Sequence, residues 1–287
     1  MENSTRTIYG SALQVAEQLK RPYVIKPFTT LNERFGIQAE SVFPENVYPG
    51  VGYFAIGNGG HQSVMGADSI PLSKQVQHRA TDASLYKPLP FALRATNNDF
   101  TPLERSKYGL RRVETWGGQT YYAYYLKRID LTNVVVDMTL VTVDPLDGTE
   151  QPSNFVPSSE NLVPTAPVLF NTGTNILTSD YVTCSSRLAI SLSALEVKEI
   201  MDACLIIRGS VDYAIISEVA ICAGVDKVIL LEDNTNFNEV VGVQVVSFIN
   251  DMHQLPYSAD GVTSLLDLGT NEPLFNIVAA SAQLVAG

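Results

Sequence analysis

The chain has 287 residues, 45% of them hydrophobic, so it can bury a substantial core. Its net charge of −11 repels polyanions, which argues against direct nucleic-acid binding. No apolar run approaches the roughly 18 residues of a membrane span, and the start, MENSTR, lacks the features of a signal peptide. We therefore expect a soluble protein that is made in a cytoplasm and has no membrane partner.

The first predicted element is a helix. Thr7 is a candidate N-cap, and Leu13, Ala16 and Leu19 are spaced to share one face before Pro22 ends the pattern.

Short strands and loops are expected over the next eighty residues. In residues 23–49, short apolar segments alternate with polar residues, and we interpret this pattern as loops and short strands. Within the turn-rich segment 50–102, residues 51–56 and 89–94 are strand-like.

A β-hairpin is the clearest local feature. Residues 110–116 and 119–128 are strand-like, and Gly117-Gly118 between them can adopt the positive φ angles of a two-residue turn. Counting outward from the turn pairs Val113 with Tyr122 and Arg111 with Tyr124. This register predicts an aromatic ladder and a cation–π contact on one face.

The hairpin is also a candidate interface. Cations gather there and nearby, and in an acidic chain they favour an acidic protein partner over nucleic acid. We place Arg111, Arg112, Tyr122 and Tyr124 in this interface. The full cationic cluster is Arg94, Arg105, Lys107, Arg111, Arg112, Lys127 and Arg128.

A further strand is expected to bury Val134, Val136, Met138 and Leu140 on one side.

Residues 144–180 predict a long, irregular, extended arm. The segment has five prolines and no Lys or Arg, and so long a structureless connection is typical of a segment that orders on a partner. Its expected contact residues are Phe155, Leu162, Val168 and Phe170. The basic hairpin of one copy could face this acidic arm on the next copy and close a ring.

After the arm, the pattern changes to a helical period. Ser193 and Glu196 form a capping box, and Gly209 is a left-handed stop for that helix. Residues 212–224 predict a second helix and 227–231 a short strand. Residues 236–252 predict a third helix, although the valines around Gly242 also permit a strand.

The expected fold class is therefore α+β. A strand-rich N-terminal and middle part, with the Gly-Gly hairpin, precedes a helix-rich C-terminal part. We expect one structural domain, 1–287, interrupted by the arm at 144–180, and a closing strand over 264–268.

The loop Gly57-Asn58-Gly59-Gly60-His61 is the first candidate for chemistry. Its glycines could bring backbone amides close to an anion, but the segment matches neither a phosphate-binding loop nor a dinucleotide fingerprint. A turn whose backbone angles require glycine is the favoured interpretation.

Two histidines provide an alternative, enzymatic hypothesis. His61 and His78, with Asp68 and Asp82, could form a metal or acid–base site if they fold together. Their spacing is unlike any compact ligand motif, and we favour hydrogen-bonding roles and no cofactor.

Aromatic residues leave one more alternative. Tyr124 and Trp116 could belong to a glycan-binding platform, although an alternating tyrosine strand is more often half core and half interface.

The odd number of cysteines, Cys184, Cys204 and Cys222, indicates reduced, structural thiols.

Six short segments of the sequence resemble a family of virion structural proteins of tailed bacteriophages. They occupy residues 7–13, 29–37, 53–61, 77–83, 122–128 and 213–227, so the similarity spans nearly the whole chain.

The resemblance implies a virion component and brings no enzymatic motif. Our leading hypothesis is a non-enzymatic structural protein that binds copies of itself and other virion proteins through multivalent contacts. The arm favours a ring subunit of the neck or collar at the head–tail junction, with a baseplate component or other tail protein as the alternative. The expected location is the virion, assembled in the host cytoplasm.

Overall fold

The computed structural model describes residues 3–37, 47–144, 146–163, 180–251, 253–255 and 261–273. They form two compact units. Unit 1 comprises residues 1–130 and 190–264, and unit 2 comprises residues 131–189 and 265–287. The expectation of one domain interrupted by an arm did not include this division.

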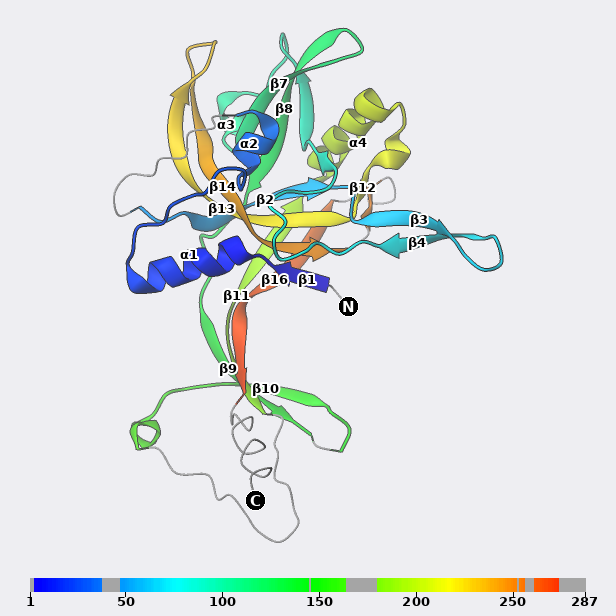
Figure 1. The fold of residues 1–287 in the computed structure, drawn as a ribbon. Coiled ribbons are helices and arrows are strands. Elements are labelled where there is room, and N and C mark those ends of the chain that lie inside the picture. Colours follow the sequence, from blue (N-terminus) through cyan, green and yellow to red (C-terminus); the bar gives the residue numbers. More distant parts are fainter. Residues whose placement is uncertain are drawn as a thin grey trace. The chain divides into compact units, whose positions relative to one another are not determined.

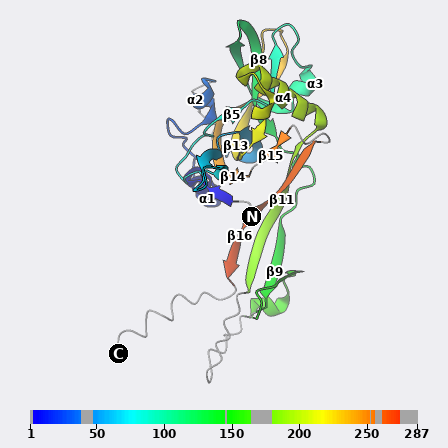
Figure 2. The same ribbon diagram turned by 90° about the vertical axis from the view of Figure 1, so that its right-hand side faces the viewer.

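Unit 1 is built on an eight-stranded antiparallel sheet (Figures 1 and 2). The strand order is β1-β14-β13-β2-β8-β6, with β5 paired to β2 and β7 paired to β8. The strands of this sheet are β1 (Asn3–Arg6), β2 (Gly50–Gly57), β5 (Pro88–Leu89), β6 (Ala92–Ala95), β7 (Tyr108–Trp116), β8 (Gln119–Arg128), β13 (Glu218–Leu230) and β14 (Asn236–Asn250).

Two small sheets and four α-helices complete the described part of unit 1. The sheets are β3 (His61–Met65) with β4 (Pro71–Gln75), and β12 (Ile215–Ile216) with β15 (His253–Gln254). The helices are α1 (Ile8–Leu19), α2 (Leu31–Phe35), α3 (Pro102–Arg105) and α4 (Ala194–Arg208), with a 3₁₀ turn at Val211–Tyr213. Helices α1 and α2 pack against β14, and α4 packs against β6.

The predicted fold class is wrong, because the C-terminal part is mostly strands. Of the residues that the structure describes, strands account for 48% and helices, the 3₁₀ turns included, for 18%. Of the three helices expected after residue 190, only α4 forms. The other two segments form β12, β13 and β14 instead.

Burial on both faces explains this error. Consecutive residues of β13, including Ile221, Cys222 and Ala223, are all buried, as are most residues of β14. A strand covered on both sides carries a continuous apolar run, and such a run also satisfies helical spacing. The valines around Gly242 were the better guide, since β-branched side chains favour strands.

The capped helices agree better with expectation. Thr7 caps α1 by accepting a hydrogen bond from the Gly10 amide, as predicted. Ser193 and Glu196 form the predicted capping box of α4, and Gly209 ends it with φ 80°. Helix α2 was missed, although Thr30 and Glu33 form a capping box of the same kind.

The hairpin prediction is confirmed in detail. Gly117 and Gly118 have φ angles of 57° and 81°, as a two-residue turn with two left-handed positions requires. Val113 pairs with Tyr122, and Arg111 pairs with Tyr124. The Arg111 guanidinium carbon lies 3.5 Å from the centre of the Tyr122 ring, which forms the expected cation–π contact.

A second sheet has four strands in the order β10-β9-β11-β16, and most of its residues belong to unit 2. Its strands are β9 (Asp137–Val143), β10 (Glu150–Asn154), β11 (Tyr181–Leu192) and β16 (Val262–Pro273), and a 3₁₀ turn spans Ser159–Leu162. The start of the predicted irregular arm is therefore structured, because β10 pairs with β9. Residues 164–179 of that arm lie outside the described residues.

The burial expected for the strand at 134–140 is wrong. Strand β9 begins only at Asp137, and its buried residue is Val141, on the opposite face. Val136 and Met138 are exposed, and Val134 and Leu140 are partly buried. The closing strand expected at 264–268 is present within β16.

Asn32 joins α2 to β14 at an irregularity in the sheet. Its side chain is fully buried, its Nδ2 donates to the Val240 carbonyl (2.9 Å), and its Oδ1 accepts from the Val243 amide (2.8 Å). The β13–β14 register shifts between Ala223 and Val225, where a bulge disrupts the ladder. The Asn32 amide satisfies two backbone groups there that would otherwise be buried without partners.

We expect Asn32→Ala to lower the free energy of unfolding by at least about 2 kcal/mol, because two buried backbone groups lose their partners. Asn32→Asp should cost at least as much, because it keeps the acceptor for the Val243 amide but places a carboxylate against the Val240 carbonyl in a buried site. Urea denaturation measures both, with the exposed Asn97→Ala as a control expected to be neutral. Equal stability of Asn32→Ala and Asn97→Ala would contradict this role.

Candidate functional site

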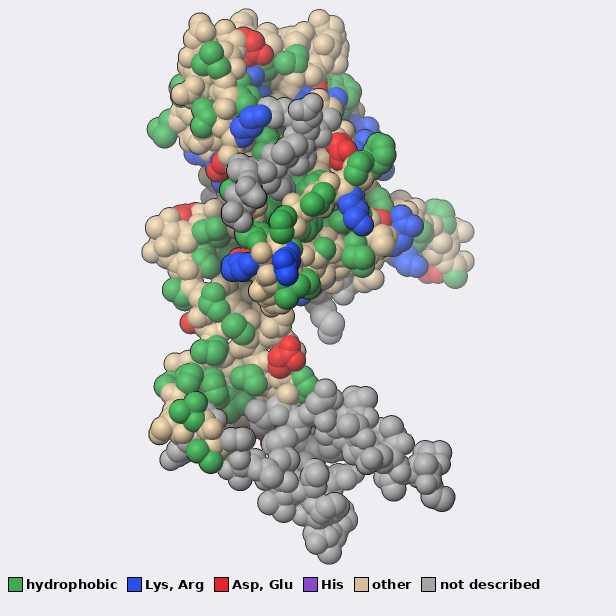
Figure 3. All heavy atoms as spheres, turned by 60° about the vertical axis from the view of Figure 1, so that its left-hand side comes forward, with side chains coloured by type: hydrophobic (Ala, Val, Ile, Leu, Met, Phe, Trp, Pro, Cys, Tyr) green, Lys and Arg blue, Asp and Glu red, His purple; other side chains and the backbone are tan. Residues whose placement is uncertain are grey.

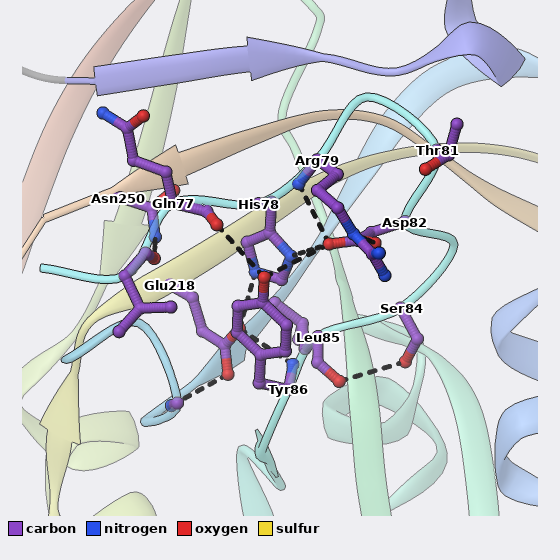
Figure 4. A network of polar contacts seen from close by, with 12 residues as sticks. Gln77, His78, Arg79, Thr81, Asp82, Ser84, Leu85, Tyr86, Glu218 and Asn250 are labelled. Atoms are coloured by element: carbon purple, nitrogen blue, oxygen red, sulfur yellow. Dashed lines mark hydrogen bonds and ion pairs between the residues drawn. The ribbon is translucent and has the colours of Figure 1, made fainter. Parts of the chain in front are cut away.

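The carboxylate of Glu218, at the start of β13, is the centre of a buried polar cluster (Figure 4). Its side chain is completely buried. Oε1 accepts hydrogen bonds from the Gly59 and Lys87 amides, each at 2.9 Å. Oε2 accepts from the Tyr86 amide (2.9 Å) and lies 2.8 Å from His78 Nε2. We call this arrangement the Glu218 clamp.

His78 is held by its neighbours on every side. Its ring stacks between Tyr86 (4.1 Å between centroids) and Phe248 (3.7 Å). Nε2 contacts Glu218, and Nδ1 lies 3.4 Å from Asp82 Oδ2. Both ring nitrogens are thus engaged by carboxylates of the chain, as Figure 4 shows.

The glycine-rich loop does approach an anion, and that anion is the chain's own Glu218. A Cβ at Gly57 would lie 2.5 Å from Glu218 Oε1, and one at Gly59 would lie 2.5 Å from the Tyr86 Cβ. A Cβ at Gly60 would lie 2.1 Å from the Ser217 carbonyl oxygen. None of the three glycines has a positive φ. Close packing, and not the expected backbone angles, requires glycine here.

The clamp shifts the ionisation of its own carboxylate. Burial raises the pKa of Glu218, but the hydrogen bonds from His78, Lys87, Tyr86 and Gly59 outweigh it and hold the pKa below its ordinary value. Glu218 therefore stays ionised at neutral pH. Its bonds tie the loop after β2 and the segment before β5 to the start of β13.

The two histidines do not share a site. His61 Nδ1 lies 2.8 Å from Ser217 Oγ and faces a pocket of about 770 Å³, whereas His78 belongs to the clamp. Asp68 lies in the exposed turn between β3 and β4. Across the described ranges, no group of three or more His, Cys, Asp or Glu side chains is arranged to hold a metal ion.

The predicted interface residues of the hairpin have partners inside unit 1. Tyr124 is fully buried and donates to Asp99 Oδ1 (2.6 Å). Arg111 reaches Asp99 (3.4 Å) and Glu232 (3.3 Å) while it stacks on the partly buried Tyr122. Tyr124 consequently has no exposed face for a protein partner or a sugar.

The cationic cluster is largely neutralised within the chain. Arg112, which is partly exposed, contacts Glu114 (2.9 Å), and Glu114 also accepts a hydrogen bond from Trp116 Nε1 (2.7 Å). The other ion pairs of the cluster are Arg94–Glu199, Arg105–Asp233, Lys127–Glu196 and Arg128–Asp226. The hairpin is therefore not an open basic surface, because its charges fasten β6, β7, β8 and α3 to neighbouring elements.

The expected contact residues of the arm divide into two groups. Phe155 is partly buried, and its amide donates to the Met138 carbonyl (2.9 Å). Leu162 is 83% exposed. Val168 and Phe170 lie outside the described residues.

The cysteines are free thiols in different surroundings. Cys184 is exposed, and Cys204 and Cys222 are buried. Burial raises the pKa of the Cys204 thiol to about 11 and raises that of Cys222 as well. Both buried thiols are therefore protonated and unreactive at neutral pH.

Glu239, on β14, is a candidate that the sequence did not indicate. It is only 4% exposed, and no hydrogen bond or ion pair to it occurs among the described residues. Burial raises its pKa to about 7, against the opposing effect of Lys227 on β13. In the sequence, a single Glu among valines is typical of an exposed position on an edge strand. Only the tertiary structure shows that Glu239 is buried without a hydrogen-bond partner among the described residues.

Residues 1–283 match the model of a family of unknown function, DUF7208. The chain belongs to this family. Neither the curated proteins nor the solved structures contain a significant match. In the part of this DUF7208 chain that the structure describes, no helix is both long and apolar enough to cross a membrane.

Glu218→Gln should destabilise this DUF7208 protein by about 1–3 kcal/mol, because an amide offers one oxygen where the clamp needs two. Its NH₂ group would face donors. The midpoint of urea unfolding at neutral pH measures the effect. The exposed Glu17→Gln on α1 is the matched control, and equal midpoints for the two variants would contradict the clamp.

Glu239→Gln should have the opposite effect, and only at higher pH. A carboxyl group whose pKa is raised in the folded state makes the protein less stable as the pH rises from the ordinary pKa of 4.5 to the folded pKa of about 7. The full loss of stability remains above that pH. The free energy of unfolding of the variant should therefore equal that of the wild type near pH 4.5. Above pH 7 it should exceed the wild-type value by about 1–3 kcal/mol.

Unfolding curves at several pH values test this, with Glu17→Gln again as the control. Lys227 on β13 acts on the Glu239 carboxyl, and Arg111 and Arg112 on β7 and Glu232 after β13 line the same pocket. A pH-independent difference between Glu239→Gln and the wild type would contradict the assignment.

Proposed function

We propose that this protein is a non-enzymatic structural component of a tailed-bacteriophage virion that forms a ring at the neck or collar. It acts by binding copies of itself and other virion proteins. The resemblance of six short sequence segments to tailed-phage virion proteins supports the class of function. The surface of unit 2 is the observation that carries the proposal.

Unit 2 exposes most of the large apolar side chains that the structure describes in it. Ten are exposed, whereas Val141 and Leu188 alone are buried. The most exposed are Leu146 (94%), Leu162 (83%) and Val163 (73%). Burying one such side chain contributes about 1.5–3 kcal/mol, so a partner surface would gain several such contributions here. Exposed apolar surface of this extent is typical of protein–protein interfaces.

The charge of unit 2 suits a defined protein partner. Eight of the chain's acids but only one of its cations, Arg187, belong to this unit. Arg187 pairs with Asp267 (2.8 Å). Figure 3 shows hydrophobic side chains together with acidic ones over the strands of unit 2. This combination repels nucleic acid and anionic membranes and favours an apolar partner surface with basic residues.

The polar cluster of unit 1 supports a structural role as well. The Glu218 carboxylate and both nitrogens of His78 are occupied by other groups of the chain. A general base or nucleophile needs a free position toward a substrate. In the clamp, these hydrogen bonds hold the loop after β2 and the segment before β5 in place.

Replacement of Leu146, Leu162 and Val163 by Ser should abolish incorporation into particles without unfolding the protein. All three side chains are exposed in the monomer, so the change removes intermolecular burial and few internal contacts. Complementation of a phage that lacks the gene, followed by immunoblotting of purified particles, measures incorporation. Circular dichroism confirms that the variant folds.

Leu103→Ser, at a leucine of α3 that is 80% exposed in unit 1, is the matched control. Normal incorporation of the triple variant would overturn the role of unit 2. Electron microscopy of intact particles tests the location: density at the head–tail junction supports the neck or collar, and density only at the baseplate contradicts it.

A further inference from the structure

The β13–β14 turn region and β7 enclose a pocket of about 370 Å³ in unit 1. Its apolar lining includes Val113, Ile229, Leu230 and Phe237. Val113 and Leu230 are more than half exposed, so this lining is open to a partner. Glu239 is the one acid of the lining that has no partner within the described residues.

The other charges of the pocket are already balanced. Arg111 pairs with Asp99 and Glu232, and Arg112 pairs with Glu114. Lys227 lies opposite Glu239 in the β13–β14 register but forms no ion pair with it in the described structure. A buried carboxylate without a partner is costly. The pocket therefore suits a side chain with an apolar stem and a cationic end, which is the chemistry of lysine.

The β3–β4 hairpin of the same chain carries such a side chain. Among the described residues its strands pair only with each other, and the hairpin projects from unit 1 on the side away from the β13–β14 turn (Figure 1). Met65, Ile70 and Leu72 are all more than half exposed on it. An isolated two-stranded hairpin is marginally stable in water, so this one would gain from a partner that covers it.

Lys74 follows Leu72 by two residues on β4, so the two side chains share a face of the hairpin. Lys74 is exposed and has no ion pair among the described residues. The Leu72–Lys74 face thus presents an apolar group beside an ammonium, and the pocket presents an apolar lining beside a carboxylate.

We propose that the Glu239 pocket binds Lys74 on the β3–β4 hairpin of a second copy of this chain. This inference rests on the proposed self-assembly and names its contact. The hairpin and the pocket lie at different places on unit 1, so the contact is heterologous, each copy donating its hairpin to the next. A contact of this kind closes a ring when the rotation between copies permits.

Sedimentation velocity of the full chain over a concentration series tests the inference. Lys74→Glu and Glu239→Gln should each weaken self-association at least tenfold relative to the wild type, because each removes one half of the ion pair. Lys198→Glu, at an exposed lysine of α4, should associate as the wild type does. Glu239→Gln keeps the shape of the side chain, so it remains informative where a larger change disturbs folding.

Mixing two charge-reversed proteins gives the sharper result. Lys74→Glu and Glu239→Lys should each fail to associate alone, and their mixture should recover association, because each hairpin then meets an opposite charge in the other variant's pocket. A purely structural role for either residue cannot produce this recovery.

Wild-type protein that stays monomeric at every concentration would overturn the inference, as would association that none of these variants changes. If the pocket variants enter particles normally while the unit 2 triple variant does not, the pocket contact is wrong and the proposed function stands. If both sets enter particles normally, both proposals fail.

Discussion

A buried, ionised carboxylate determines how three separate segments meet on the large sheet of unit 1. Glu218 sits at the start of β13, and its two oxygens take up amides from the loop after β2 and the segment before β5, together with His78. Removing a charge from water is costly, so such a group persists only when its lone pairs are satisfied. The same requirement makes glycine necessary at positions 57, 59 and 60, where a Cβ would collide with the clamp or its surroundings.

The two units bury their apolar residues to different degrees. Unit 1 encloses a core in which α2 stacks Phe35 against Tyr125 (4.3 Å) and most of β14 is covered. The described part of unit 2 buries Val141 and Leu188 and exposes many more apolar side chains than it buries. A small sheet of this composition gains little from folding alone. Contact with other molecules would contribute the missing burial, and for this reason we propose an assembly role for the chain.

Local signals predicted the features that depend on a few neighbouring residues. The caps at Thr7 and Ser193 and the turn at Gly117-Gly118 each combine a preferred residue with a fixed backbone geometry, so their positions and the hairpin register followed from spacing. The same rule could have located α2 through Thr30 and Glu33, but residues 23–49 were interpreted as loops and short strands. The prediction of two further C-terminal helices was wrong, because a strand buried on both faces has no alternation of apolar and polar residues that distinguishes it from a buried helix.

The sequence was sufficient to locate the helices capped by Thr7 and Ser193 and the tight hairpin, and to show that the chain is acidic and that its cations and acids are segregated along its length. What those charges do depends on the fold. Arg111 and Lys127 pair with acids far away in the chain, whereas Glu239 has no hydrogen bond or ion pair to any residue that the structure describes. Capping and turn formation involve residues within a few positions of each other, but ion pairing and burial depend on which distant segments the sheet brings together.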